Sequence, residues 1–165
     1  MKKLNYKYTR FCILQLIILL TCSCTKFLDV DTPVGEISTS NVFNSESSTE
    51  AAIVGVYSQI MATNNYFLNG GLSLFAGLSS DEIYNTSPNL NYDPFKSNAL
   101  NSSNSVVSNN LYRFAYAYIY QANLILENLP KAKISESNKN RYIGEILFIR
   151  SLCYFYLINL WGDVQ

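Results

Sequence analysis

The stretch Arg141–Val164 reads RYIGEILFIRSLCYFYLINLWGDV, and it carries the strongest fold signal in the chain. Its apolar side chains recur every three or four residues, which predicts one buried stripe along an α-helix. The residues of this stripe are Tyr142, Ile146, Ile149, Cys153, Tyr156 and Leu160. We expect the helix to begin between Ser135 and Asn138 and to end at Gly162, because glycine readily terminates a helix.

Apolar side chains also cover the other faces of this helix. They are Leu147, Phe148, Leu152, Phe155 and Trp161. A helix that is apolar nearly all round is expected to be buried on several sides. Glu145 and Arg150 fall inside the run and argue against a membrane span, where charges are costly. The helix therefore calls for a further packing partner, which is either another chain or a C-terminal segment absent from this one.

Two further helices are predicted upstream. The first is expected to begin near Ser47, because Ser47 and Glu50 have the spacing of a capping box, and to fade after Met61. The second is expected to be capped by Ser108 or Asn109 and to end at Pro130. The fold class is therefore predicted to be all-α. The expected architecture is tetratricopeptide-like helical hairpins with long irregular loops.

The N-terminus has the pattern of an exported lipoprotein. Its basic residues precede an apolar run over residues 11–20, about half of the ~20 residues that a membrane span needs. This pattern predicts a secretory signal over residues 1–23. The residues Thr-Cys-Ser-Cys at 21–24 resemble a bacterial lipobox, with Cys24 as the lipid-bearing first residue of the mature chain. Thr21 stands where leucine is usual, and Cys22 remains an alternative.

Removal of the signal would change charge and cysteine content. The chain has 12 basic and 12 acidic residues, but four bases and no acid precede Cys24, which leaves a mature net charge of −4. A chain without a basic patch is not expected to bind nucleic acid. Only Cys153 would remain as a free thiol, and the chain contains no histidine. Neither an internal disulfide, a metal site nor a cofactor is therefore expected.

The candidate ligand site lies in and beside a polar loop over residues 85–110, which is rich in Asn and Ser. Tyr84, Tyr92 and Phe95 are its aromatic residues. An aromatic ring can stack on the apolar face of a sugar while neighbouring amides bond to its hydroxyls. The alternative is that these rings pin the loop to the helices. No catalytic residues are predicted, because no nucleophile lies beside a visible base and no separated acid pair is apparent.

Three segments are predicted: a lipoprotein signal peptide over residues 1–23, an extended tether over residues 24–46, and an incomplete helical domain over residues 47–165. Within them, CTKFLDVDTP at the mature start, STEAAIVGVYSQI, LYRFAYAYIYQANLILENL and above all RYIGEILFIRSLCYFYLINLWGDV resemble the SusD/RagB family. The matching positions of the last stretch are Glu145, Phe148, Arg150, Tyr154, Phe155, Gly162, Asp163 and Val164. Ile146 and Ser151 replace small alanines of the family pattern, and Gln165 replaces a proline.

This resemblance implies a surface lipoprotein rather than an enzyme. Family members are held on the outer membrane by acyl chains such as palmitate, face outward, and form a lid on a SusC-like TonB-dependent transporter. They capture a glycan or oligopeptide ligand as part of nutrient uptake. They are also several times longer than this chain, so the resemblance implies that the chain is the truncated N-terminal portion of a larger helical fold. Two alternatives therefore stay open: a nonfunctional truncated fragment of such a protein, and a small helical adaptor lipoprotein that docks on a partner protein.

Overall fold

The computed structural model describes residue 15 and residues 39–64, 66–86 and 89–164. The chain divides into two units, Met1–Ile37 and Ser38–Gln165, of which the second holds nearly all of the described residues. Within the described residues the regular structure is helical, and extended pairing is limited to isolated bridges of Tyr66. This confirms the predicted all-α class, while the tetratricopeptide-like pairing stays a prediction. The elements are α2 (Thr39–Val42), α3 (Glu46–Met61), α4 (Gly71–Ser79), α5 (Asp93–Lys96), the π-helix η2 (Val106–Tyr112), α6 (Arg113–Asn128), the 3-10 turn η3 (Leu129–Lys131) and α7 (Glu136–Trp161).

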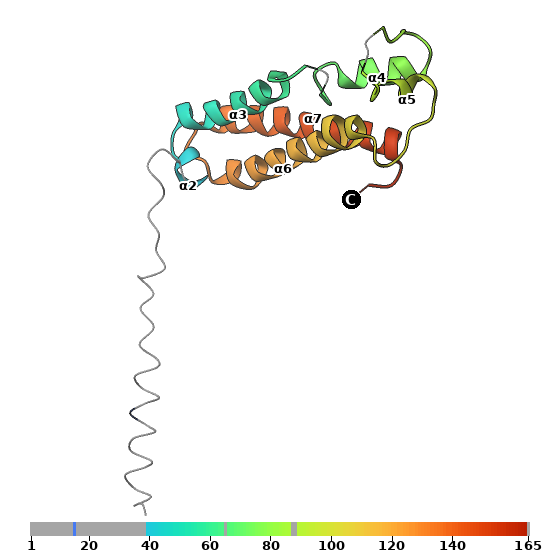
Figure 1. Cartoon of the computed structure of the whole chain (residues 1–165). Helices are drawn as coiled ribbons and strands as arrows, with labels where there is room; N and C mark the ends of the chain where they lie inside the picture. The colour runs from blue at the N-terminus through green and yellow to red at the C-terminus, as the bar shows by residue number, and fades with distance from the viewer. Residues whose placement is uncertain (1–14, 16–38, 65, 87–88, 165) are drawn as a thin grey trace, which may run out of the picture. The chain divides into compact units, whose positions relative to one another are not determined.

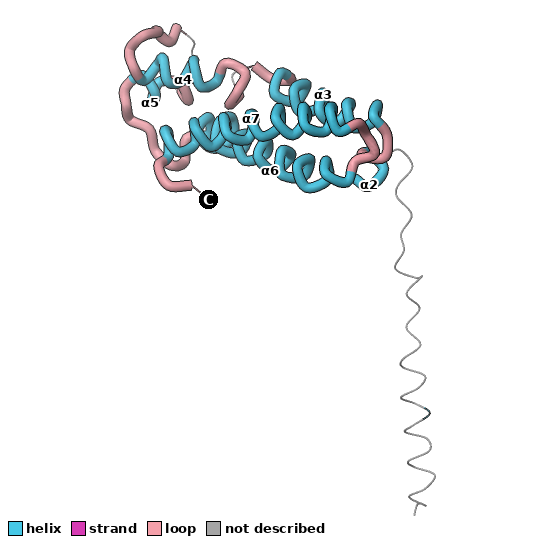
Figure 2. Tube along the Cα trace, turned by 180° about the vertical axis from the view of Figure 1, so that it is seen from behind, coloured by secondary structure: helices cyan, strands magenta, loops and turns pink. Residues whose placement is uncertain are grey.

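Three long helices form the body of the second unit. α6 and α7 make an antiparallel hairpin through η3, and α7 has its most extensive contact with α6. α3 lies along the same pair, α2 lies at one end, and α4 and α5 lie together at the other end (Figure 1, Figure 2). The loop between α4 and η2 is therefore held at the end of the bundle where α7 finishes.

The ends of α7 agree with the prediction from sequence. The Ser135 side chain accepts a hydrogen bond from the Asn138 backbone N–H at 3.2 Å, which satisfies a free donor of the first turn. Gly162 follows the last helical residue with a φ of 79°, a conformation that favours glycine. Both ends are thus set by local chemistry.

The core between α6 and α7 contains small as well as large residues. Ala115 and Ala122 on α6 are fully buried, and small residues allow helices to pack closely. The buried residues of α7 are Tyr142, Ile146, Ile149, Cys153 and Leu157. The predicted stripe was therefore right over its first four members and wrong at its end, where Leu157 is buried and Leu160 is exposed.

The outward face of α7 is apolar and exposed. Leu147, Phe148, Phe155 and Ile158 all lie on the side away from the buried stripe, and Phe148 is 68% exposed. In the described structure only the face of α7 toward the bundle is covered, and the further packing partner that the sequence calls for stays a prediction. Among the described residues, α7 is the helix that is long and apolar enough to cross a membrane by length and composition.

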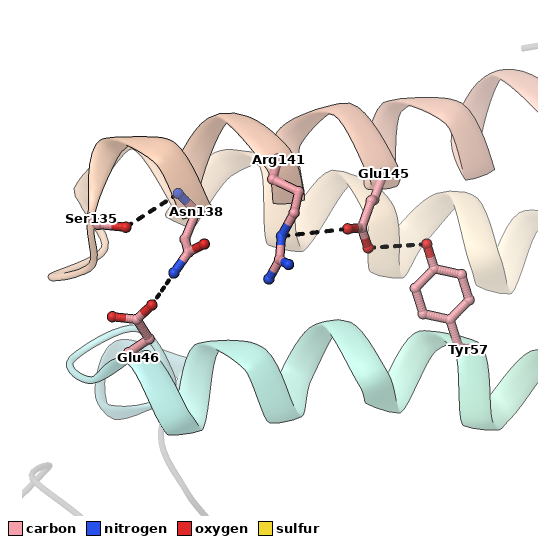
Figure 3. A network of polar contacts seen from close by, with 6 residues as sticks. All are labelled: Glu46, Tyr57, Ser135, Asn138, Arg141 and Glu145. Atoms are coloured by element: carbon pink, nitrogen blue, oxygen red, sulfur yellow. Dashed lines mark hydrogen bonds and ion pairs between the residues drawn. The ribbon is translucent and has the colours of Figure 1, made fainter.

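Polar side chains connect α3 to α7 (Figure 3). The Asn138 amide donates to the Glu46 carboxylate at the start of both helices. Further along, the Tyr57 hydroxyl donates to Glu145 Oε2 at 3.2 Å, and Arg141 Nε lies 3.8 Å from Glu145 Oε1. Residue numbers rise together along the two helices, so α3 and α7 run parallel.

Two expectations about where helices start are corrected. α3 is capped by Ser45, whose side chain accepts from the Ser48 N–H, so the capping box predicted at Ser47 does not form. The second long helix begins earlier than predicted, with η2 at Val106, so the predicted caps at 108 and 109 lie inside it.

The predicted tether is not wholly extended. Its residues 39–42 form α2, and Phe43 is buried with its carbonyl accepting from the Lys133 N–H at 3.0 Å. The compact unit therefore starts at Ser38 rather than at residue 47. The rest of the tether, the predicted lipid site Cys24 and, apart from residue 15, the predicted signal lie outside the described residues.

Candidate functional site

The three aromatic residues predicted to contact a ligand occupy two different environments. Tyr92 and Phe95 pack against Phe75 of α4, with ring centroids 5.2 Å and 4.7 Å apart. These two rings hold the loop on α4, as the alternative interpretation expected. Tyr84 is 71% exposed, and the Lys96 Nζ lies 3.7 Å from the centroid of its ring. Tyr84 is therefore the one of the three that presents its ring to solvent.

Asn104 fixes the end of the loop where η2 begins. Its Oδ1 accepts hydrogen bonds from the Val106 N–H at 2.9 Å and the Val107 N–H at 3.2 Å, and its Nδ2 donates to the Asn91 carbonyl at 3.2 Å. Asn104 is also one of two buried polar residues in the described part of the chain. An Asn shortly before two apolar residues was a readable capping signal, which our sequence interpretation missed.

We expect Asn104→Ala to lower the free energy of unfolding by about 1–2 kcal/mol, because two N–H groups and one carbonyl lose their partner. Ser105→Ala is the matched control, since the Ser105 side chain makes no capping hydrogen bond. Thermal unfolding followed by circular dichroism measures both. Equal melting temperatures for the two variants would show that the Asn104 contacts do not order this end of the loop.

A cavity of about 510 Å³ lies between the loop, α4, α5, η2 and the end of α7. Ligand pockets are commonly roughly 300–1,000 Å³ in volume. The cavity is lined by Leu72, Phe75, Ala76, Ser79, Ser80, Phe95, Leu100, Asn101, Ser102, Val107, Leu111, Leu160 and Trp161. Most of these side chains are apolar, and the polar ones come from the end of α4 and from residues 101–102. Five separate segments thus build one apolar hollow beside the predicted ligand loop.

Trp161 is the only tryptophan of the chain, and it stands at the wall of this cavity. Its ring meets Tyr112 edge-on with centroids 5.5 Å apart, and Tyr112 in turn contacts Tyr116 at 4.8 Å. Trp161 therefore packs against Tyr112 at the end of α7 and also faces the cavity.

The titratable groups of the described part do not form a reactive cluster. Cys153 is fully buried, and burial raises the pKa of its thiol to about 12, so the thiol stays protonated at neutral pH. Among the described residues, no group of three or more His, Cys, Asp or Glu side chains is placed to hold a metal ion.

Comparisons with known proteins give the chain a relative and a family. Residues 26–165 match the SusD-like family described as "Starch-binding associating with outer membrane". The "SusD-like protein P25" of Formosa agariphila is 35% identical over 160 residues, which are 92% of this chain and 30% of that protein. The chain thus spans under a third of the length of this relative. No solved structure was found to match.

Proposed function

Because the chain belongs to the SusD-like family, we propose that it binds glycans at the cell surface as a lipid-anchored outer-membrane protein. The observation that carries this proposal is the match of residues 26–165 to a family described as starch-binding and associated with the outer membrane. Its partner would be a SusC-like TonB-dependent transporter, to which it would deliver nutrients. Its work would be binding and not catalysis.

Tyr84 is the residue that we propose as the sugar platform. Its exposed ring has a flat apolar face, and sugars present a similar face of C–H groups. Lys96 lies over the ring at 3.7 Å and can donate hydrogen bonds to sugar hydroxyls beside it. Tyr92 and Phe95 would act indirectly, by holding the loop on α4.

We expect Tyr84→Ala to weaken polysaccharide binding roughly tenfold, which corresponds to about 1.4 kcal/mol. Tyr120→Ala is a matched control, because Tyr120 is 69% exposed but lies on α6. Affinity gel electrophoresis against a panel of polysaccharides that includes starch measures the effect. If no polysaccharide retards the parent chain, glycan binding by this chain is refuted. If both tyrosine variants bind like the parent, the glycan site lies elsewhere.

A helical adaptor lipoprotein is a second candidate function, and the outward face of α7 favours it. Leu147, Phe148, Phe155 and Ile158 present apolar side chains to solvent along one side of the helix, and such patches mark protein contacts. A chain that binds no polysaccharide but loses a partner protein on Phe148→Ser would support the adaptor over the glycan-binding role.

A further inference from the structure

The cavity beside the loop has an apolar interior and a polar rim. Phe75 and Phe95 are almost fully buried and form part of its wall, together with Leu72 and Leu111. The polar lining residues, which we call the rim, are Ser79, Ser80, Asn101 and Ser102; the last three are exposed, as are the apolar Leu100 and Leu160. The buried part of the lining is therefore apolar, whereas its exposed part holds polar as well as apolar groups.

The rim groups have unused hydrogen-bonding capacity. The Asn101 Oδ1 accepts from the backbone N–H and the hydroxyl of Ser103 at 3.0 Å and 2.7 Å, which fixes the side-chain amide. Within the described part of the chain, its Nδ2 and the hydroxyls of Ser79 and Ser102 have no such partner. They can therefore bond to a ligand without first breaking a contact within the protein.

We propose that this cavity binds the apolar substituent of a substituted saccharide, such as an acyl ester or an aromatic group, while the rim bonds to the sugar. The saccharide part rests on the proposed function. Sugar hydroxyls pushed into the apolar interior would lose their hydrogen bonds to water and find few partners, so a bare sugar stays at the rim. An apolar substituent gains by leaving water, and it fits the interior.

Trp161 makes occupancy directly measurable, because it is the only tryptophan and it lines the cavity. The purified full chain is titrated with para-nitrophenyl glycosides, whose nitrophenyl group quenches tryptophan fluorescence, and with the matching methyl glycosides. N-acetyltryptophanamide gives the quenching that occurs without a site. We expect saturable quenching by the para-nitrophenyl glycosides, and at least tenfold weaker binding of the methyl glycosides in competition.

A variant that fills the cavity tests the location. Ala76 and Ser73 are both exposed on α4, but only Ala76 lines the cavity. Ala76→Phe is expected to weaken the saturable quenching at least tenfold, whereas Ser73→Phe leaves it unchanged. Circular dichroism of both variants confirms that the helices are retained. Equal quenching in the two variants would overturn the assignment to this cavity.

The outcomes separate this inference from the proposed function. Methyl glycosides that compete as tightly as para-nitrophenyl glycosides would overturn the apolar preference and leave glycan binding intact. Absence of saturable quenching would overturn the inference, and the polysaccharide gels would then decide the proposed function separately. If para-nitrophenol alone binds as tightly as its glycosides, the saccharide part of the inference is refuted.

Discussion

Replacing Ile146 with alanine is expected to lower the free energy of unfolding by about 2–5 kcal/mol. Ile146 is 0% exposed on the face of α7 that packs against the bundle. Its truncation removes buried methyl and methylene groups and leaves a void that the neighbouring helices only partly close. Domains of ordinary stability unfold with about 5–15 kcal/mol, so this loss is a large share of the total. Urea unfolding followed by far-ultraviolet circular dichroism measures it.

Ile158→Ala is the matched control, because it makes the same substitution in the same helix at a side chain that is 55% exposed. We expect its free energy of unfolding to stay within about 0.5 kcal/mol of the parent. Equal losses in the two variants would contradict the described burial, since they would mean that the outward face of α7 is also covered in the folded protein. The pair therefore tests which side of α7 is the core.

The limits of α7 could be predicted because they depend on neighbours in sequence. Ser135 and Gly162 each act on backbone groups within one turn. The start of α3 was harder to predict, because four serines lie within residues 40–48. The residue that caps the N-terminus of a helix typically has an extended backbone. Ser45 has this conformation, with φ −141° and ψ 159°. Which serine adopts that conformation depends on where α2 and Phe43 pack, and no local pattern reveals it.

The side of α7 that is buried could be predicted only in part. A helix with apolar residues on every face has no strong direction, so periodicity alone ranks several stripes almost equally. Packing against α6, on which Ala115 and Ala122 are fully buried, selects the stripe that ends at Leu157. The sequence pattern indicated a helix with apolar residues on every face. It could not indicate that the described part covers one face and leaves Phe148 and Phe155 in solvent.

The candidate site was predictable as a loop but not as a cavity. The aromatic residues beside the loop were visible in sequence, yet whether a ring is exposed depends on Phe75, which lies on a different element. The cavity brings together residues between Leu72 and Trp161. No spacing rule connects positions so far apart, because their contact follows from how α7 and α4 end at the same side of the bundle.

Replacing Cys24 with alanine is expected to abolish fatty-acid incorporation and to move the chain from the membrane fraction to the soluble fraction. The proposed anchor is the acylated Cys24 thiol and new amino terminus after removal of residues 1–23. Each buried methylene of an acyl chain contributes about 0.8 kcal/mol, and a single chain binds membranes only marginally. Loss of every acyl chain should therefore release the protein completely. Metabolic labelling with a fatty-acid analogue and membrane fractionation measure both effects.

Cys22→Ala is the matched control, because Cys22 lies two residues upstream in the same segment and would be removed with the signal. This variant should keep its label and its membrane association. Label that persists in Cys24→Ala but disappears in Cys22→Ala would move the lipid site to Cys22. Label that is absent from the parent chain would refute the lipid anchor altogether. Glycan binding by the purified chain would be unaffected in each case, because the proposed anchor and the proposed sugar platform lie on separate parts of the sequence.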